Sequence, residues 1–191
     1  MKINNVKVEK QPAKHNCWQT AAEGIYEYFR KQLVQQFAGS GRLNSLTEWQ
    51  KSSTGKKLGE ELLGIYLKGK GLMPEDTDKL KYYGLVKVNL NAGKASEADW
   101  SELLIKFGPL FFGGDFGFGF RHAVVIDGAD TGSIHYQDPD TGEGNSVQIH
   151  TMNARLAKGG TLMVFTGGWN KTMPQERSDQ ARIIGLHRAV I

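Results

Sequence analysis

The sequence predicts an α+β protein in which helices dominate the first half and strands the second. Two observations carry this prediction. Apolar residues recur at three- and four-residue spacing after Cys17, which is typical of an amphipathic helix. Short apolar or alternating runs separated by turns, many of them rich in glycine, follow in the second half, as expected for strands. We expect these strands at about 109–113, 121–128, 133–138, 145–150 and 161–166.

The first helix is expected to begin at Cys17. Its apolar face consists of Trp18, Ala21, Ala22, Ile25, Phe29, Leu33 and Phe37. Charged and amide side chains occupy most of the remaining positions, and Gly39 and Gly41 end the pattern. Cys17 therefore lies in the first turn, where the helix dipole and unpaired N–H groups stabilise a negative charge.

The elements between this helix and the strands are less regular. The stretch 39–57 is rich in Gly, Ser, Thr and Lys, so we expect a connection anchored by Leu43, Leu46 and Trp49. A short helix is predicted over 58–67 and a strand near 85–90. Another helix follows. Ser96 and Asp99 form a start resembling a capping box, and Gly108-Pro109 stops the helix.

Length and composition indicate one domain over residues 1–191, with a helical part over about 1–108, a sheet part over about 109–166 and an extension over 167–191. The net charge is +4, but the lysines are spread along the chain, so we expect a solvated face and no nucleic-acid partner. We find no signal peptide and no apolar stretch long enough for a membrane helix. The single cysteine excludes an intramolecular disulfide, which suits a reducing cytoplasm.

Four residues in a fixed order indicate thiol chemistry: Gln11, Cys17, His122 and Asp138. An imidazole stabilises a thiolate as imidazolium and then protonates the leaving amine. A carboxylate on the other ring nitrogen holds the tautomer of the imidazole. An amide side chain six residues before the cysteine can bind an oxyanion together with the cysteine N–H. The types and order of these residues therefore predict a thiol hydrolase.

Each of these residues also has a simpler interpretation. Cys17 is a candidate for a small buried hydrophobe, and His122 for a histidine at a strand end. Asp138 precedes Pro139 and an Asp-Thr-Gly sequence, which together form a strong turn signal. Gln11 has the composition of a solvated loop residue.

The sequence resembles the papain-like cysteine peptidases, through Gln11-x5-Cys17-Trp18 and through His122-Ala-Val-Val-Ile-x-Gly128 followed by Asp138-Pro139. The likeness spans roughly residues 8–166. It is nearer to bacterial leader-peptide peptidases of bacteriocin export and to papain-like effector proteases than to the plant enzymes, which have Asn at the third position.

The resemblance implies a helical lobe packed against a twisted antiparallel sheet, with the active-site cleft between them. It also implies a Cys-His-Asp triad, a Gln oxyanion donor and a protein or peptide substrate. It allows an inhibitor or immunity protein as partner and delivery into a target cell. Two alternatives stay open: a thiol amidase or acyltransferase acting on a non-protein amide, and a papain-like binding module without enzymatic activity.

The remaining features are less specific. Gly113–Arg121 alternates glycine with phenylalanine directly before His122, which fits either a flexible hairpin connection or an aromatic wall of the cleft. No cofactor is expected. One cysteine without His-x3-His or Cys-x2-Cys spacing gives no support for a metal site.

Overall fold

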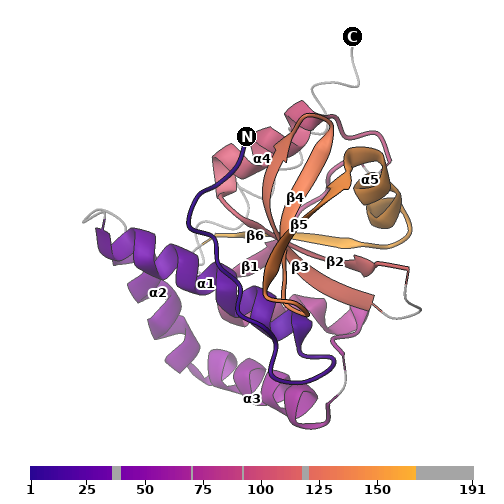
Figure 1. Ribbon diagram of the computed structural model, residues 1–191. Helices are drawn as coiled ribbons and strands as arrows, with labels where there is room; N and C mark the ends of the chain where they lie inside the picture. Colours follow the sequence, from indigo (N-terminus) through magenta and orange to yellow (C-terminus); the bar gives the residue numbers. More distant parts are fainter. Residues whose placement is uncertain (36–39, 70, 92, 118–120, 167–191) are drawn as a thin grey trace.

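The computed structural model describes residues 1–35, 40–69, 71–91, 93–117 and 121–166, and it is an α+β fold (Figure 1). The strands are β1 (Leu85–Lys87), β2 (Leu110–Asp115), β3 (Arg121–Asp130), β4 (Ser133–Asp138), β5 (Glu143–Gln148) and β6 (Thr161–Phe165). The helices are α1 (Cys17–Gln35), α2 (Ser40–Lys51), α3 (Ser53–Leu67), the 3-10 helix η1 (Pro74–Tyr83), α4 (Glu97–Phe107) and α5 (Ile149–Ala157).

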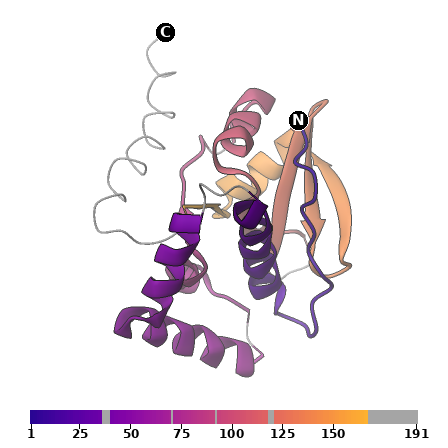
Figure 2. The same ribbon diagram turned by 90° about the vertical axis from the view of Figure 1, so that its left-hand side faces the viewer.

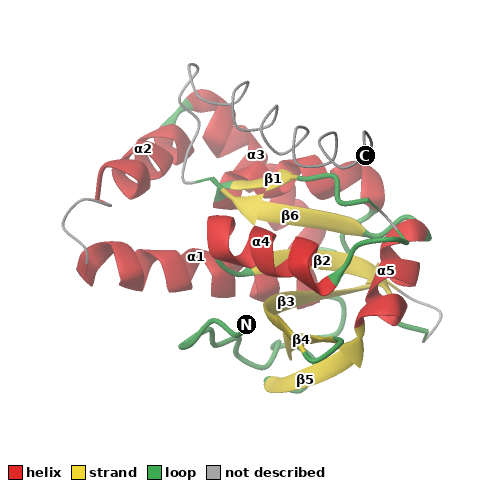
Figure 3. Cartoon of the chain, turned by 90° about the horizontal axis from the view of Figure 1, so that it is seen from above, coloured by secondary structure: helices red, strands yellow, loops and turns green. Residues whose placement is uncertain are grey.

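The six strands form one sheet in the order β1-β6-β2-β3-β4-β5, and every pairing is antiparallel. Figure 3 shows this order from β1 and β6 at one edge to β4 and β5 at the other. The long strand β3 carries His122. It pairs with β2 on one side and with β4 on the other, with a bulge between Ile126 and Gly128.

Both faces of the sheet are covered by helices. Because side chains alternate along a strand, Ala123 and Val125 of β3 contact one core while Val124 and Ile126 contact the other. The first core contains α1 and the second contains α4 and α5. We expected the helical residues before 108 to form a single lobe. Instead they divide between the two faces of the sheet. The helices α1, α2 and α3 gather on one side (Figure 1), while α4 packs on the opposite face.

The stretch predicted as a connection over 39–57 is mostly helical, which corrects the sequence analysis. Helix α2 covers Ser40–Lys51, and α3 begins at Ser53, five residues before the predicted start. The Ser52 hydroxyl accepts the Gly55 N–H and caps α3. Of the expected anchors, Leu46 is fully buried and Trp49 packs against the same core as α1. The polar composition of this stretch gave no helical signal, because α2 is stabilised by tertiary packing rather than by its own sequence pattern.

Two further predictions need correction. The strand expected at 145–150 is β5, and it ends at Gln148. From Ile149 the chain forms α5, so His150 is helical rather than part of a strand. The strand expected near 85–90 is limited to β1, and the helix η1 before it was not predicted. Only the first two residues of α5 fell within the predicted strand, and the rest of this short helix was not assigned to any element.

Helix α4 begins and ends where the sequence predicts. The Ser96 hydroxyl accepts the Asp99 N–H, and the Asp99 carboxylate accepts the Ser96 N–H, which completes a capping box. Gly108 ends the helix with a φ of 76°. Its missing side chain also matters for packing, because a Cβ there would lie 2.7 Å from the Phe29 ring.

The N-terminal segment runs alongside the sheet before it enters α1 (Figure 2). Ile3 donates its N–H to the Asp127 carbonyl, and Lys2 bridges Gly128. Further along, the Gln11 N–H binds the Pro139 carbonyl at 2.7 Å. The chain before Cys17 is thus attached to β3 at one end and to the turn after β4 at the other. The expected extension 167–191 and Phe37 lie outside the described residues. In the part of the chain that is described, no helix is long and apolar enough to cross a membrane.

Candidate active site

Cys17 is the first residue of α1, and it is 6% exposed. The Asn16 carbonyl accepts the N–H groups of Gln19 and Thr20, each at 3.1 Å, which fixes the first turn of the helix. The apolar face of α1 packs against Ala123 and Val125 of β3. The helix therefore places its only thiol next to the strand that carries His122.

His122 and Asp138 lie on adjacent antiparallel strands, and their side chains meet. His122 Nε2 is 2.6 Å from Asp138 Oδ1. The same oxygen accepts the Asp140 N–H at 2.9 Å. The His122 and Asp138 side chains are 10% and 17% exposed, so water has little access to the bond between them. The turn predicted after Asp138 therefore does not exclude a role at the site, since it supplies the N–H that holds the carboxylate.

The His122 imidazole also interacts with the Cys17 thiol. Burial alone lowers the pKa of His122, but hydrogen bonds to Asp138 and Cys17, and the charges of both groups, raise it to about 9. Because Nε2 is taken by Asp138, Nδ1 is the ring nitrogen left for the thiol. At neutral pH the ring is an imidazolium, which is the form that stabilises a thiolate and carries a proton for a leaving group.

The Asp138 carboxylate is ionised at neutral pH. Its burial raises the pKa, but the hydrogen bonds from His122 and from the Asp140 N–H outweigh this effect and bring the pKa below its usual value. The carboxylate is therefore a hydrogen-bond acceptor that holds the orientation of the His122 ring.

Gln11 lies beside this group, on the segment bound to the turn after β4. Its Nε2 donates to Asp140 Oδ1 at 3.0 Å, and its backbone N–H binds the Pro139 carbonyl. Gln11 is thus attached to the same turn as Asp138. An amide nitrogen carries two hydrogens, and one of them remains after the bond to Asp140.

An aromatic cluster packs against the imidazole. Phe116 is 9% exposed, and its ring lies 5.4 Å from the His122 ring at an interplanar angle of 84°. The Tyr136 ring lies 5.9 Å from the Phe116 ring, and the Arg155 guanidinium lies 4.1 Å from the centre of the Phe116 ring. Phe116 thus packs between the core and the His122 ring, and the aromatic-wall interpretation of the segment before His122 stays a prediction, since 118–120 lie outside the described residues. Sequence reasoning missed Arg155 because it belongs to the unpredicted α5.

A metal-binding arrangement is not found in the described part of the chain, where no three His, Cys, Asp or Glu residues group closely enough to hold an ion. Another histidine, His135, binds Asp130 at the far end of β3. The residues that do gather around Cys17 are those suited to acyl-transfer chemistry.

A thiol on a helix N-terminus, next to an imidazole that is bound to a carboxylate on an antiparallel sheet, is the arrangement of a papain-like thiol hydrolase. The chain belongs to the family described as papain-like cysteine protease AvrRpt2, which it matches over residues 1–157. A search of curated proteins gave no match. The protein is therefore a papain-like cysteine peptidase of a family named after a bacterial effector. The matched range includes Gln11, Cys17, His122 and Asp138 and ends before β6.

Proposed function

We propose that the protein cleaves protein or peptide substrates with Cys17 as nucleophile, His122 as acid and base, Asp138 as the orienting carboxylate and Gln11 as an oxyanion donor. The observation that carries the proposal is the 2.6 Å bond between His122 Nε2 and Asp138 Oδ1, on a ring that also binds the Cys17 thiol. Family membership supplies the substrate class, since cysteine proteases act on proteins.

In the proposed reaction the Cys17 thiolate attacks the carbonyl carbon of the scissile amide, and a C–S bond forms. The C–N bond then breaks as the His122 imidazolium gives its proton to the departing amine. Neutral His122 next takes a proton from water, whose oxygen attacks the thioester. The acid leaves, and the thiolate and imidazolium are restored. One amide and one water give one acid and one amine.

The Gln11 amide and the Cys17 N–H would bind the oxyanion of both tetrahedral intermediates. The bond from Gln11 Nε2 to Asp140 supports this role, because it fixes the amide before substrate arrives. Such preorganised donors lower the barrier without reorganising during the reaction.

We further propose that the enzyme acts in the reducing cytoplasm of a target cell, as an effector delivered there. Cys17 is a free thiol, and the chemistry requires it to stay reduced. An inhibitor or immunity protein in the producing cell would then be a natural partner. The nearness to bacteriocin-leader peptidases stays a prediction.

The proposal is tested by labelling new N-termini in a cell lysate after incubation with the wild type or with Cys17→Ala. Discrete new N-termini that appear only with the wild type are expected. If folded Cys17→Ala yields the same termini, Cys17 is not the nucleophile. If the wild type cleaves no protein but hydrolyses a non-protein amide, the proposed substrate class is wrong.

A further inference from the structure

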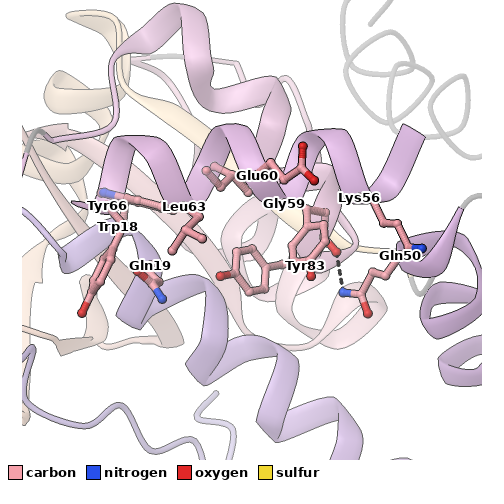
Figure 4. A pocket seen from close by; sticks show the side chains of 11 residues that line it. Trp18, Gln19, Gln50, Lys56, Gly59, Glu60, Leu63, Tyr66 and Tyr83 are labelled. Carbon is pink, nitrogen blue, oxygen red and sulfur yellow. Dashed lines mark hydrogen bonds between the residues drawn. The ribbon is translucent and has the colours of Figure 1, made fainter. Parts of the chain in front are cut away.

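The two faces of the sheet meet the catalytic pair differently. On the face covered by α1, residues of α1, α3 and η1 line a pocket (Figure 4). On the other face, the His122 ring packs against Phe116, and Arg155 of α5 lies over the Phe116 ring. We propose that Arg155 is a positioning residue, which holds Phe116 against His122 and so keeps the imidazole aligned with Asp138. This inference rests on the proposed function and adds to it a residue outside the triad.

Side chains, rather than strand pairing, hold the Phe116 ring. Phe116 follows the last residue of β2, so it has no partner in the sheet. Its ring lies 6.0 Å from that of Phe112, 5.9 Å from that of Tyr136 and 5.4 Å from that of His122. The Arg155 guanidinium lies closer than any of these rings, at 4.1 Å from the ring centre. A cation over an aromatic face is attracted to it, and more strongly where water is excluded.

The end of α5 is attached to the strand that carries His122. Arg121, the residue before His122, donates from Nη2 to the Gly159 carbonyl at 3.0 Å. The next residue, Gly160, donates its N–H to the Arg155 carbonyl at 3.1 Å. A Cβ on Gly160 would lie only 2.8 Å from that carbonyl oxygen, so the turn after α5 fits closely around Arg155. The guanidinium thus comes from a helix whose end is fixed next to the catalytic histidine.

Tyr136 gives Arg155 a second connection to the catalytic pair. It lies on β4 two residues before Asp138, so the two side chains are on the same face of the sheet. Burial and the negative charge of Asp138 raise the pKa of Tyr136, while the charge of Arg155 and a hydrogen bond from it offset part of this effect. The phenol is therefore neutral at physiological pH. It accepts a hydrogen bond from the same guanidinium that covers Phe116.

These two contacts suit arginine better than lysine. A guanidinium is planar, so it can stack on a ring while the N–H groups at its edge donate hydrogen bonds. A lysine ammonium is a compact charge without such a plane. Arg155 Nη1 is also buried without a hydrogen-bond partner among the described residues. Because a buried donor without a partner costs free energy, stability alone does not explain an arginine at this position.

The test compares Arg155→Met and Arg155→Lys with Lys106→Met. Lys106 is a matched control, because its ammonium lies 5.3 Å from the Phe107 ring on α4, outside the site. In Arg155→Met, kcat for a Cys17-dependent peptide should fall about fivefold, the factor that a partly buried cation–aromatic contact is worth in an equilibrium. KM should stay the same. Arg155→Lys should remain at least about threefold below the wild type, since its charge lacks the planar shape. Lys106→Met should keep the kcat of the wild type.

The proton in the 2.6 Å bond between His122 and Asp138 supplies a readout that a purely structural role would not change. Its exchange with water, followed by NMR, should be faster in both Arg155 variants than in the wild type. It should be unchanged in Lys106→Met, whatever the melting temperature of that variant. If Arg155→Met does not fold, Arg155→Lys carries the same comparison.

Three results would overturn the positioning role while the enzyme stands. The first is wild-type kcat in both Arg155 variants. The second is wild-type proton exchange in both, even where kcat and the melting temperature fall together. The third is full recovery of kcat and exchange in Arg155→Lys, which would mean that charge alone matters. If no peptide or protein is cleaved in a Cys17-dependent way, the proposed function fails, and the exchange rates still decide whether Arg155 holds the pair.

Discussion

Two histidine–aspartate pairs lie on the same two strands of this protein, at opposite ends of β3. His122 Nε2 and Asp138 Oδ1 are 2.6 Å apart, and His135 Nε2 and Asp130 Oδ1 are 2.7 Å apart. By bond length alone the pairs are almost equal. Their surroundings differ. The side chains of the first pair are 10% and 17% exposed, and those of the second are 25% and 38% exposed.

We infer from this difference that a hydrogen bond between histidine and aspartate does not by itself make a reactive site. The His122 pair adjoins the N-terminus of α1 with its thiol, and Phe116 packs on its ring. The His135 pair lies beside the chain's N-terminus, with an Asp130 carboxylate whose pKa is lowered by the bond from His135. We therefore expect limited access of water and a neighbouring thiol, rather than the bond itself, to make the His122 pair the reactive one.

The largest expected effect separates the two histidines. His122→Ala removes the group that holds and transfers the proton, so kcat/KM should fall by about 10²–10⁴. His135→Ala should stay within about twofold of the wild type. Steady-state cleavage of one Cys17-dependent substrate measures both.

Alkylation by iodoacetamide at pH about 6 checks the same comparison without turnover. The wild type and His135→Ala should react faster than a free thiol, and His122→Ala should react more slowly. Equal rates in all three proteins would show that the imidazole does not activate Cys17. Reaction only after denaturation would make Cys17 a buried core residue.

We expect a nearly comparable loss of activity when Gln11 is replaced. Gln11 is linked to the His122–Asp138 pair through its bond to Asp140. Gln11→Ala should lower kcat by about 10²–10³, raise KM much less and leave Cys17 reactive. Gln11→Glu should be at least as damaging. A carboxylate there would repel the oxyanion and also Asp140, which the amide now contacts at 3.0 Å. Full kcat in Gln11→Ala would mean that its spacing to Cys17 is coincidental.

The two aspartates should differ less than the histidines do. Asp138→Ala removes a hydrogen bond to a charged group, worth about 1.5–3 kcal/mol, so kcat/KM should fall roughly 10- to 150-fold. Asp138→Asn should retain more activity, since its amide oxygen still accepts the imidazole N–H. Asp130→Ala should leave kcat/KM unchanged. A ranking in which Asn is no better than Ala would show that charge, rather than orientation, is what Asp138 supplies.

The sequence contained the order of the site residues but little of their surroundings. The order of Cys17, His122 and Asp138, together with the papain-like resemblance, predicted which residues meet, and local signals placed them at a helix start and on strands. The aromatic Phe116 was noticed only as part of a glycine-rich segment. Its partner Arg155 lies on α5, in a stretch to which no element was assigned, and the Arg155 contact arises only when the chain folds across the sheet. Likewise the polar stretch containing α2 gave no periodic signal, since its helix depends on packing against α3 and the core.

The pH dependence gives a smaller but directional effect. The pKa of His122 is raised to about 9, so the imidazolium is present below that pH and is lost above it. The rate of cleavage should therefore decline as the pH rises through about 9. In Asp138→Asn the negative charge is gone while burial remains, and burial lowers the pKa of the ring. The decline should then begin at lower pH. An unchanged alkaline limb in Asp138→Asn would show that another group controls it.

The smallest effect concerns Phe116, whose ring packs against the His122 ring. Among the described residues, no aromatic ring is found packed against His135 in the same way. Phe116→Leu keeps an apolar group but loses the edge-to-face contact, worth about 0.5–1.5 kcal/mol, so kcat should fall roughly 2- to 10-fold. Phe107→Leu is the matched control. Phe107 is 7% exposed, lies in the same core as Phe116 and belongs to α4 rather than to the wall of the site.

Proton NMR separates positioning from general stability in these variants. A proton held in the 2.6 Å bond between His122 and Asp138 should give a low-field signal that water exchanges slowly. Phe116→Leu should accelerate its exchange because the ring that covers His122 is smaller, and Phe116→Tyr should largely restore it. Phe107→Leu should lower the melting temperature without changing the signal. Equal exchange in Phe116→Leu and the wild type would assign Phe116 to the core alone, and the protection of the His122 pair would then come from the sheet itself.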